Sequence, residues 1–75
     1  GLRHPDVETW LIDVIRDDEH VNVCAAAVEL LGEIGSAAAV DPLEGLKQRF
    51  PDQPFICFAA DVALDRIQPV RGAPR

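Results

Sequence analysis

Positive charge is scarce in this sequence. Seven lysines and arginines stand against 13 aspartates and glutamates, which gives a formal net charge of −6 at pH 7. Nucleic acids and anionic membrane surfaces are bound through clusters of basic side chains. The composition therefore excludes nucleic acid as a general partner, and it favours a protein partner with a basic or neutral surface.

Long hydrophobic runs are also missing. The longest wholly apolar run, Val23 to Val28, is far shorter than the roughly 20 residues that a membrane-spanning helix needs. The start of the sequence does not combine positive charge, an apolar segment and small residues in the manner of a signal peptide. We therefore expect no membrane association.

The usual signatures of catalysis are absent as well. The chain has no tyrosine, no serine nucleophile elbow and no glycine-rich phosphate-binding loop. His20 and Cys24 lie within one helical turn of each other with Asp17 nearby, but these groups fall short of the ligand set of a structural zinc site. The apolar and acidic surroundings of Cys24 oppose the thiolate that a catalytic cysteine needs. The sequence predicts no catalytic residue, no metal, no cofactor and no enzyme activity.

What the sequence does contain is a repeat. Six apolar residues in one stretch have the spacing of a helix with a single buried stripe. They are Val23, Ala26, Ala27, Leu30, Leu31 and Ile34. The same pattern returns 33 residues later, at Ile56, Ala59, Ala60, Ala63, Leu64 and Ile67. Units of this length bury their apolar stripes by stacking on one another, so the pattern predicts a helical repeat protein.

Four helices account for most of the chain. Apolar spacing predicts helices over residues 6–16 and 21–34, a third that ends near residue 50, and a fourth over 54–67. Trp10 lies on the apolar stripe of the first helix, and we expect it in the core rather than on a ligand platform. Short connections make neighbouring helices antiparallel.

These helices divide the chain into four parts. Residues 1–5 form a lead-in segment, residues 6–35 the first repeat, residues 36–67 the second repeat, and residues 68–75 a linker or disordered tail.

Particular residues mark the helix ends. Gly35 is expected to adopt the left-handed conformation and close the second helix, and Ser36 can cap the helical segment after it. Pro42 leaves two possibilities for the third helix. The helix starts late with Asp41 as its cap, which we favour, or it kinks after a first turn from Ala37.

An acidic run, Asp17 to Glu19, comes after the first helix. We place Asp18 or Glu19 near the N-terminus of the second helix, where carboxylates are stabilised. The run is interpreted as a solvated turn, with contact to a basic partner as the alternative.

The two cysteines occupy the same position in the two repeats, because Cys24 and Cys57 are also 33 residues apart. Equivalent points on stacked helices lie about 8–10 Å apart. That distance exceeds the roughly 7 Å limit on the Cα separation of a disulfide. We therefore expect two free thiols, which suits a reducing, cytoplasmic location.

The first copy also resembles a known repeat. V-N-V-C-A-A-A-V-E-L-L-G-E-I-G at residues 21–35, with A-V-D-P-L after it at residues 39–43, is similar to the short HEAT-like repeats of the phycocyanobilin lyase type. His20 departs from the aspartate usual there, and the second copy has Asp65 where the first has Gly32. The resemblance implies an all-α, right-handed solenoid of two helical hairpins. In such a solenoid the second helix of each hairpin lines a concave, ligand-facing side.

Transferred to this chain, the resemblance places the outward faces of the second and fourth helices on the concave side. The candidate partner contacts on these faces are Val28, Glu29, Phe58, Asp61, Val62 and Asp65. Two interpretations stay open: a groove for a protein partner, or a surface that packs against a following repeat. Some HEAT-like enzymes hold iron with paired His-Glu motifs. This sequence has no His-Glu pair, because His4 precedes Pro5 and His20 precedes Val21.

These features favour a protein–protein interaction scaffold without catalysis, which binds through the concave face of two HEAT-like hairpins. The alternative is an accessory or regulatory segment of a larger enzyme, such as a bilin-lyase-like subunit. Apolar residues beyond a single stripe, Trp10 and Phe55 among them, further predict self-association through the solenoid ends or contact with neighbouring repeats.

Overall fold

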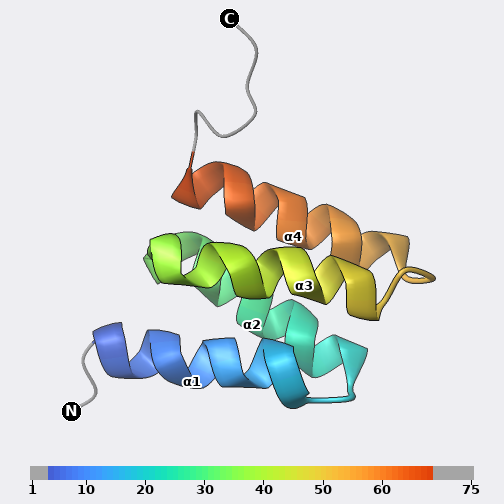
Figure 1. Ribbon diagram of the computed structural model, residues 1–75, viewed down its shortest axis with the longest axis horizontal. Helices are drawn as coiled ribbons and strands as arrows, with labels where there is room; N and C mark the ends of the chain where they lie inside the picture. The colour runs from blue at the N-terminus through green and yellow to red at the C-terminus, as the bar shows by residue number, and fades with distance from the viewer. Residues whose placement is uncertain (1–3, 69–75) are drawn as a thin grey trace, which may run out of the picture.

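The computed structural model describes residues 4–68, which form four α-helices and one short 3₁₀-helix (Figure 1). In chain order these are α1 (His4–Asp17), α2 (Val21–Ile34), η1 (Ala37–Ala39), α3 (Val40–Arg49) and α4 (Pro54–Ile67). The described residues contain no strand, and the predicted all-α class is confirmed. The predictions for residues 1–3 and for the tail at residues 69–75 lie outside the described residues.

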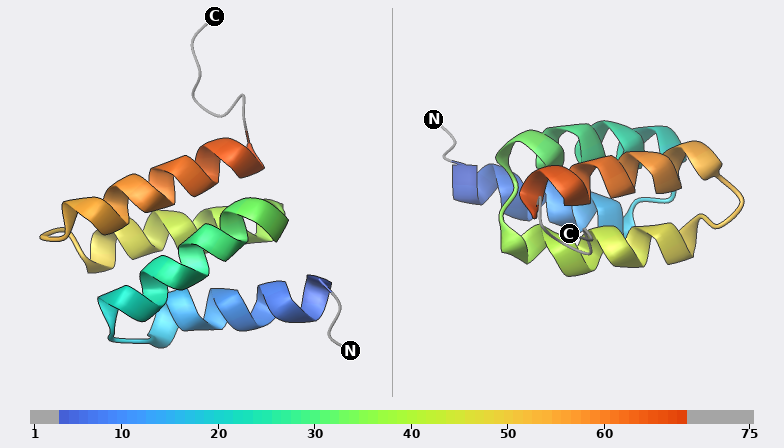
Figure 2. Two further views of the ribbon diagram at one scale, coloured as in Figure 1. Left: turned by 180° about the vertical axis from the view of Figure 1, so that it is seen from behind. Right: turned by 90° about the horizontal axis from the view of Figure 1, so that it is seen from above.

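The helices form two antiparallel hairpins that stack in two layers. Repeat one consists of α1 and α2, and repeat two consists of η1, α3 and α4. Contacts join α1 to α2 and α3 to α4 within the hairpins, and α1 to α3 and α2 to α4 between them. Seen from above, α1 and α3 form one layer and α2 and α4 form the other (Figure 2). This is the solenoid arrangement expected from the repeat.

Helix boundaries agree closely with the sequence. The bounds of α2 and α4 are those predicted, and Pro54 opens α4 as expected. The first helix begins at His4, earlier than the predicted residue 6, so Pro5 lies in its first turn. A proline costs no hydrogen bond there, because the first N–H groups of a helix have no partner within the helix.

Backbone and thiol contacts recur with the repeat. The N–H of Cys24 donates to the carbonyl of His20 at 3.0 Å, and the N–H of Cys57 donates to that of Gln53 at 3.3 Å. The Cys24 thiol lies 3.7 Å from the carbonyl oxygen of Val14, and the Cys57 thiol lies 3.8 Å from that of Lys47. Both cysteines are free, as predicted.

The buried stripe of α2 differs from the predicted one. Ala27 and Leu31 are buried as expected, but Val23 is 44% exposed and Leu30 is 50% exposed. Cys24 and Val28 are buried in addition. The stripe is turned toward α4 because that helix covers one flank of α2, whereas no described helix covers the flank of Val23 and Leu30.

The prediction that Trp10 lies in the core is wrong. Trp10 is 62% exposed, and Leu11 and Ile15 carry the core packing of α1. All three belong to the apolar stripe of α1, which is wider than the surface that α2 and α3 cover. Helical spacing therefore identified the apolar face but not which part of it is buried.

The third helix does not start late. Ser36 caps η1 by accepting a hydrogen bond from the N–H of Ala38 at 3.3 Å, which confirms its predicted role. The α-helix then begins at Val40, and Ala39 rather than Asp41 occupies the cap position. A turn from Ala37 thus precedes the helix, as in the alternative. Pro42 fits inside the first α-helical turn, where its missing N–H is not needed.

Gly35 does not adopt the predicted left-handed conformation. Its φ of −71° and ψ of 157° are those of extended backbone. A Cβ at this position would lie 2.5 Å from the carbonyl oxygen of Leu31 and 3.1 Å from Cδ1 of Ile67. Glycine is therefore needed here mainly because a Cβ would clash with the last turn of α2, and less because of Ile67 in repeat two, rather than for a positive φ.

Candidate functional site

A groove of about 440 Å³ runs between α2 and α4. One wall comes from α2 and is lined by Ala25, Val28, Glu29, Gly32 and Glu33. The other wall comes from α4 and is lined by Phe55, Phe58, Ala59, Val62, Ala63 and Arg66. We call this surface the α2–α4 groove.

Small residues set the depth of the α2–α4 groove. A Cβ at Gly32 would lie 3.4 Å from the Cα of Ala63 and 3.5 Å from Cδ of Arg66, so the two helices approach closely at this point. Ala59 and Ala63 keep the facing side of α4 low. The floor is therefore narrow and apolar, and larger side chains rise along the edges.

Aromatic and branched side chains form the α4 edge. Phe55, Phe58 and Val62 are spaced at i, i+3 and i+7 and therefore lie on one side of the helix. They are 48%, 70% and 37% exposed. Such a row of exposed apolar groups is typical of surfaces that bind other proteins.

The charges in the groove are mainly negative. Glu29 and Glu33 lie one turn apart on the α2 wall, and Arg66 lies on the α4 wall. Both glutamates are exposed, and no hydrogen bond or ion pair joins either one to another residue in the range 4–68. The groove can therefore offer two carboxylates to a basic group.

The residues predicted as partner contacts separate into two sets. Glu29, Phe58 and Val62 line the groove. Val28 lies at its floor but is only 1% exposed, so the prediction that it faces outward is wrong. Its side chain is covered because α4 packs against that flank of α2.

The other two predicted contacts do not line the groove. Lys47 of α3 donates a hydrogen bond of 2.6 Å to Oδ1 of Asp61, which joins Asp61 to the neighbouring helix. This bond raises the pKa of the Lys47 amine. Asp65 is exposed but lies outside the lining residues. Whether any of the six contacts a partner stays a prediction.

Sequence reasoning missed Phe55, Glu33 and Arg66. Phe55 precedes Phe58 by three residues and Glu33 comes four residues after Glu29, so helical spacing from the predicted contacts indicates both. Arg66 comes four residues after Val62, so the same spacing indicates it as well.

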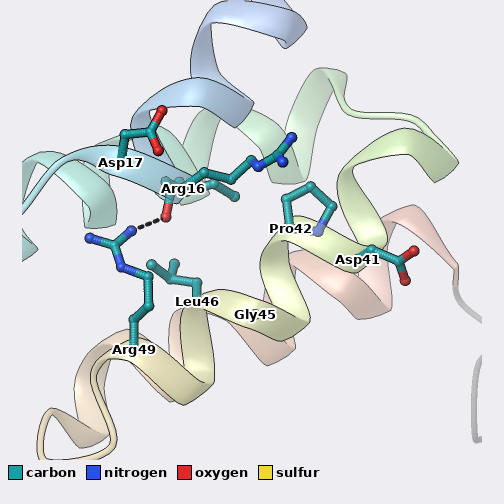
Figure 3. Close-up of a pocket in the computed structure, with 8 residues that line it drawn as sticks. Arg16, Asp17, Asp41, Pro42, Gly45, Leu46 and Arg49 are labelled. Atoms are coloured by element: carbon teal, nitrogen blue, oxygen red, sulfur yellow. Dashed lines mark hydrogen bonds between the residues drawn. The ribbon is translucent and has the colours of Figure 1, made fainter.

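A second cavity, of about 410 Å³, lies between α1 and α3. Figure 3 shows Arg49 of α3 reaching across it to the end of α1. The guanidinium donates to the carbonyl oxygens of Ile15 and Asp18, in and just after the last turn of α1, and it lies over the ring of Phe50 at 4.9 Å. A cation is favourable at a helix C-terminus, so this contact locks the two repeats together.

The acidic turn supports α2 without capping it. Oδ1 of Asp18 accepts hydrogen bonds from the backbone N–H of His20 at 2.7 Å and from Nδ1 of the same residue at 3.0 Å. The backbone hydrogen bond is the main reason that the pKa of Asp18 lies below its usual value. His20 occupies the cap position of α2 and makes no side-chain cap bond.

The structure offers little to reaction chemistry within residues 4–68. Burial raises the pKa of the Cys24 thiol, which keeps it protonated and weakly nucleophilic. No group of three or more His, Cys, Asp or Glu side chains in the described part of the chain could hold a metal ion. None of the helices described is long and apolar enough to cross a membrane.

A known protein is similar to this chain in sequence. The deoxyhypusine hydroxylase of Aspergillus oryzae is 32% identical to this chain over 66 residues, which cover 87% of the chain and 20% of the relative. The chain thus spans about a fifth of the length of the relative that it matches. No family model matches the chain. No solved structure matches it either.

This relative corrects one prediction and supports another. It is an enzyme, so the prediction of no enzyme activity is contradicted. It is also a HEAT-repeat protein, which agrees with the stacked hairpins of the structure and supports a HEAT-like helical repeat. The phycocyanobilin lyase type of that repeat is not shown.

Proposed function

We propose that this chain is a HEAT-like repeat segment of a larger enzyme related to deoxyhypusine hydroxylase, in which it holds a protein segment in the α2–α4 groove. The groove itself, apolar along one edge and acidic along the other, is the observation that carries the proposal. The relative supports the enzymatic setting.

The apolar edge supplies the binding free energy in this proposal. Phe55 and Phe58 each leave about half or more of their surface in water, and a buried aromatic ring removes a large apolar area from solvent. Aromatic residues are frequent among the few contacts that dominate protein interfaces. Truncation of Phe58 to alanine should therefore weaken binding by about 1–3 kcal/mol.

The acidic edge selects the partner. Glu29 and Glu33 would attract a lysine or arginine beside an apolar anchor, and they would repel an acidic segment. Arg66 at the far wall would limit this preference and could contact a partner carbonyl. Because these charges are exposed, binding should weaken as salt concentration rises.

The residues present do not fit an iron site. Paired His-Glu motifs are absent from the sequence, and residues 4–68 bring no three metal-ligating side chains together. We therefore place the reacting groups of the larger enzyme outside this segment. The segment would contribute position and partner binding. The two free thiols support a cytoplasmic setting.

A matched pair of variants tests the groove. In Phe58→Asp/Val62→Lys the apolar edge becomes charged. In Trp10→Asp/Val23→Lys the same two changes are made at residues of similar exposure outside the groove. Both are used with the unaltered chain in a pull-down from the source lysate, after circular dichroism has established that each is folded.

A protein captured by the unaltered chain and by the Trp10/Val23 variant, but lost with the Phe58/Val62 variant, supports the groove. Capture that survives the Phe58/Val62 change would refute it. The captured protein should bind less in high salt, and Glu29→Lys/Glu33→Lys should weaken its binding.

The enzymatic setting has its own test. The longer protein that carries this segment is assayed for hydroxylation of deoxyhypusine and for attachment of a bilin, the activity suggested by the phycocyanobilin lyase type of repeat. Hydroxylation would support the proposal. Bilin attachment would favour the alternative of a bilin-lyase-like subunit.

A further inference from the structure

The two ends of the stack differ in a way that the repeat makes visible. Trp10, Val23 and Leu30 of repeat one are exposed by 62%, 44% and 50%. The residues 33 positions later are Leu43, Ile56 and Ala63, which are exposed by only 0%, 0% and 2%. Repeat one covers that side of repeat two, and Ala63 contacts Gly32 there. Repeat two thus buries these positions against repeat one. Repeat one leaves the equivalent positions exposed.

The opposite end shows the reverse pattern. Repeat two covers Leu11, Ile15 and Val28, which are exposed by 2% or less. The residues 33 positions later are Glu44, Gln48 and Asp61, all of them polar. Lys47 pairs with Asp61 at 2.6 Å and with Glu44 at 3.6 Å on this side. This end therefore lacks the apolar groups that repeat one uses for stacking.

We propose that Trp10, Val23 and Leu30 form a docking surface for a further hairpin of the same repeat, which stacks on repeat one as repeat one stacks on repeat two. We call it the repeat-one end face. The proposal extends an interface already present in the structure by one repeat. The occupant presents apolar side chains at the positions of Leu11, Ile15 and Val28. The proposal does not depend on the α2–α4 groove.

The arginine that joins the two repeats has an equivalent in repeat one. Arg49 binds the carbonyl oxygens at the end of α1, and Arg16 occupies the equivalent position in repeat one. Arg16 is exposed. Its side chain lies along the α1–α3 cavity and extends toward Pro42 (Figure 3), so it would turn away from repeat two to bind the end of the first helix of an added hairpin. Asp13, at the position of buried Leu46, is a departure from the pattern, and so is Asp6, at the position of buried Ala39.

A second copy of the chain fits this surface poorly. Stacking two copies end to end would set Glu44, Gln48 and Asp61 of one copy against Trp10, Val23 and Leu30 of the other. Carboxylates placed against an apolar surface lose hydration without gaining a partner. The structure thus favours a hairpin with an apolar stacking side over self-association.

Two extended chains of equal added length test the docking surface. In the first, a copy of residues 4–36 precedes residue 4 of the chain and keeps the 33-residue register, so that it presents Leu11, Ile15 and Val28 to the repeat-one end face. In the second, residues 37–69 precede it and present Glu44, Gln48 and Asp61. The tryptophan of the first added copy is changed by Trp10→Phe, which leaves Trp10 of the original chain as the single fluorescent reporter.

The first extension should shift Trp10 emission to shorter wavelength, slow quenching by acrylamide and raise the urea midpoint in one cooperative transition. The second should leave Trp10 as accessible as in the unextended chain. Equal effects of the two extensions, or no shielding by the first, would overturn the proposal.

Two further measurements keep the test decisive if an extension folds poorly. Changing the second added segment by Glu44→Leu, Gln48→Ile and Asp61→Val should restore shielding of Trp10, and failure to do so counts against the proposal. Sedimentation of the unaltered chain should show a monomer with an accessible Trp10. A dimer in which Trp10 is shielded would identify a second copy as the occupant and overturn it.

Discussion

Repeat one and repeat two share an apolar pattern but bury different parts of it. Ala27 and Leu31 in the first, and Ala60 and Leu64 in the second, are buried alike inside their hairpins. At the flanks the same position changes character: Val28 is buried whereas Asp61 is exposed, and Leu30 is exposed whereas Ala63 is buried. Burial in a stack is therefore decided by the neighbour as well as by the helix.

The largest expected effect comes from replacing Val28 of repeat one with aspartate, the residue that repeat two carries at the equivalent position, Asp61. Val28→Asp places a carboxylate under α4, and position 14, which corresponds to Lys47, carries a valine that cannot pair with it. A buried charge without a partner costs about 3–5 kcal/mol. A loss of that size is a large part of the stability of a small domain, typically about 5 kcal/mol or more. Urea unfolding followed by circular dichroism should show a midpoint shifted to much lower urea concentration.

Asp61→Val is the matched control for this change. It removes an exposed ion pair with Lys47, so the free energy of unfolding should change by no more than about 1 kcal/mol. Similar losses in the two variants would mean that the two flanks do not differ as the structure indicates.

Arg49 and Arg16 provide the next comparison, because they occupy one position in the two repeats. Arg49→Ala removes two charge-assisted hydrogen bonds to the end of α1 and should destabilise the chain by about 1–2 kcal/mol. Arg16→Ala, an exposed change, should stay within about 0.5 kcal/mol. Urea midpoints of both variants measure the difference. If Arg16→Ala costs as much as Arg49→Ala, the contact across the repeats is not the source of the stability.

Gly35 and Gln68 close equivalent helices with the same backbone bond, from their N–H to the carbonyl of Leu31 or Leu64 at 2.8 Å. Gly35→Ala forces a Cβ against Leu31 and Ile67 and should cost about 1–3 kcal/mol. Gln68→Ala keeps the backbone bond and should change stability by less than about 0.5 kcal/mol. Thermal unfolding measures both variants. Equal melting temperatures for Gly35→Ala and Gln68→Ala would contradict this account.

The smallest effect concerns Asp18, which has no counterpart in repeat two, where Pro51 stands at its position. Its pKa is lower in the folded chain than its ordinary value, so the ionised form favours folding. This contribution is present at neutral pH and disappears as the pH falls below about 4, through the folded pKa. Asp18→Asn should lower the urea midpoint slightly at pH 7, and the difference from the unaltered chain should vanish at acid pH. A constant difference across that range would rule out the ionised carboxylate as its source.

Much of the candidate groove could be anticipated from the sequence. Helical spacing places Glu29 on one helix and Phe58 and Val62 on another, and it extends to Phe55 and Glu33 once the first contacts are chosen. It could not show that Val28 lies beneath α4 or that Asp61 pairs with Lys47. Both depend on which helix covers each flank, and periodicity along one helix carries no information about that.

By itself the sequence determined the four helices, the bounds of α2 and α4, and the 33-residue repeat that makes the hairpins stack. These features arise from local spacing and from proline and serine at helix ends. Only the tertiary structure decided that Trp10 is exposed, that Gly35 packs beside Ile67 in an extended conformation, and that Arg49 binds the end of α1. The physical reason is that an apolar stripe states how much surface a helix can bury, whereas the packing of its neighbours selects the part that is buried.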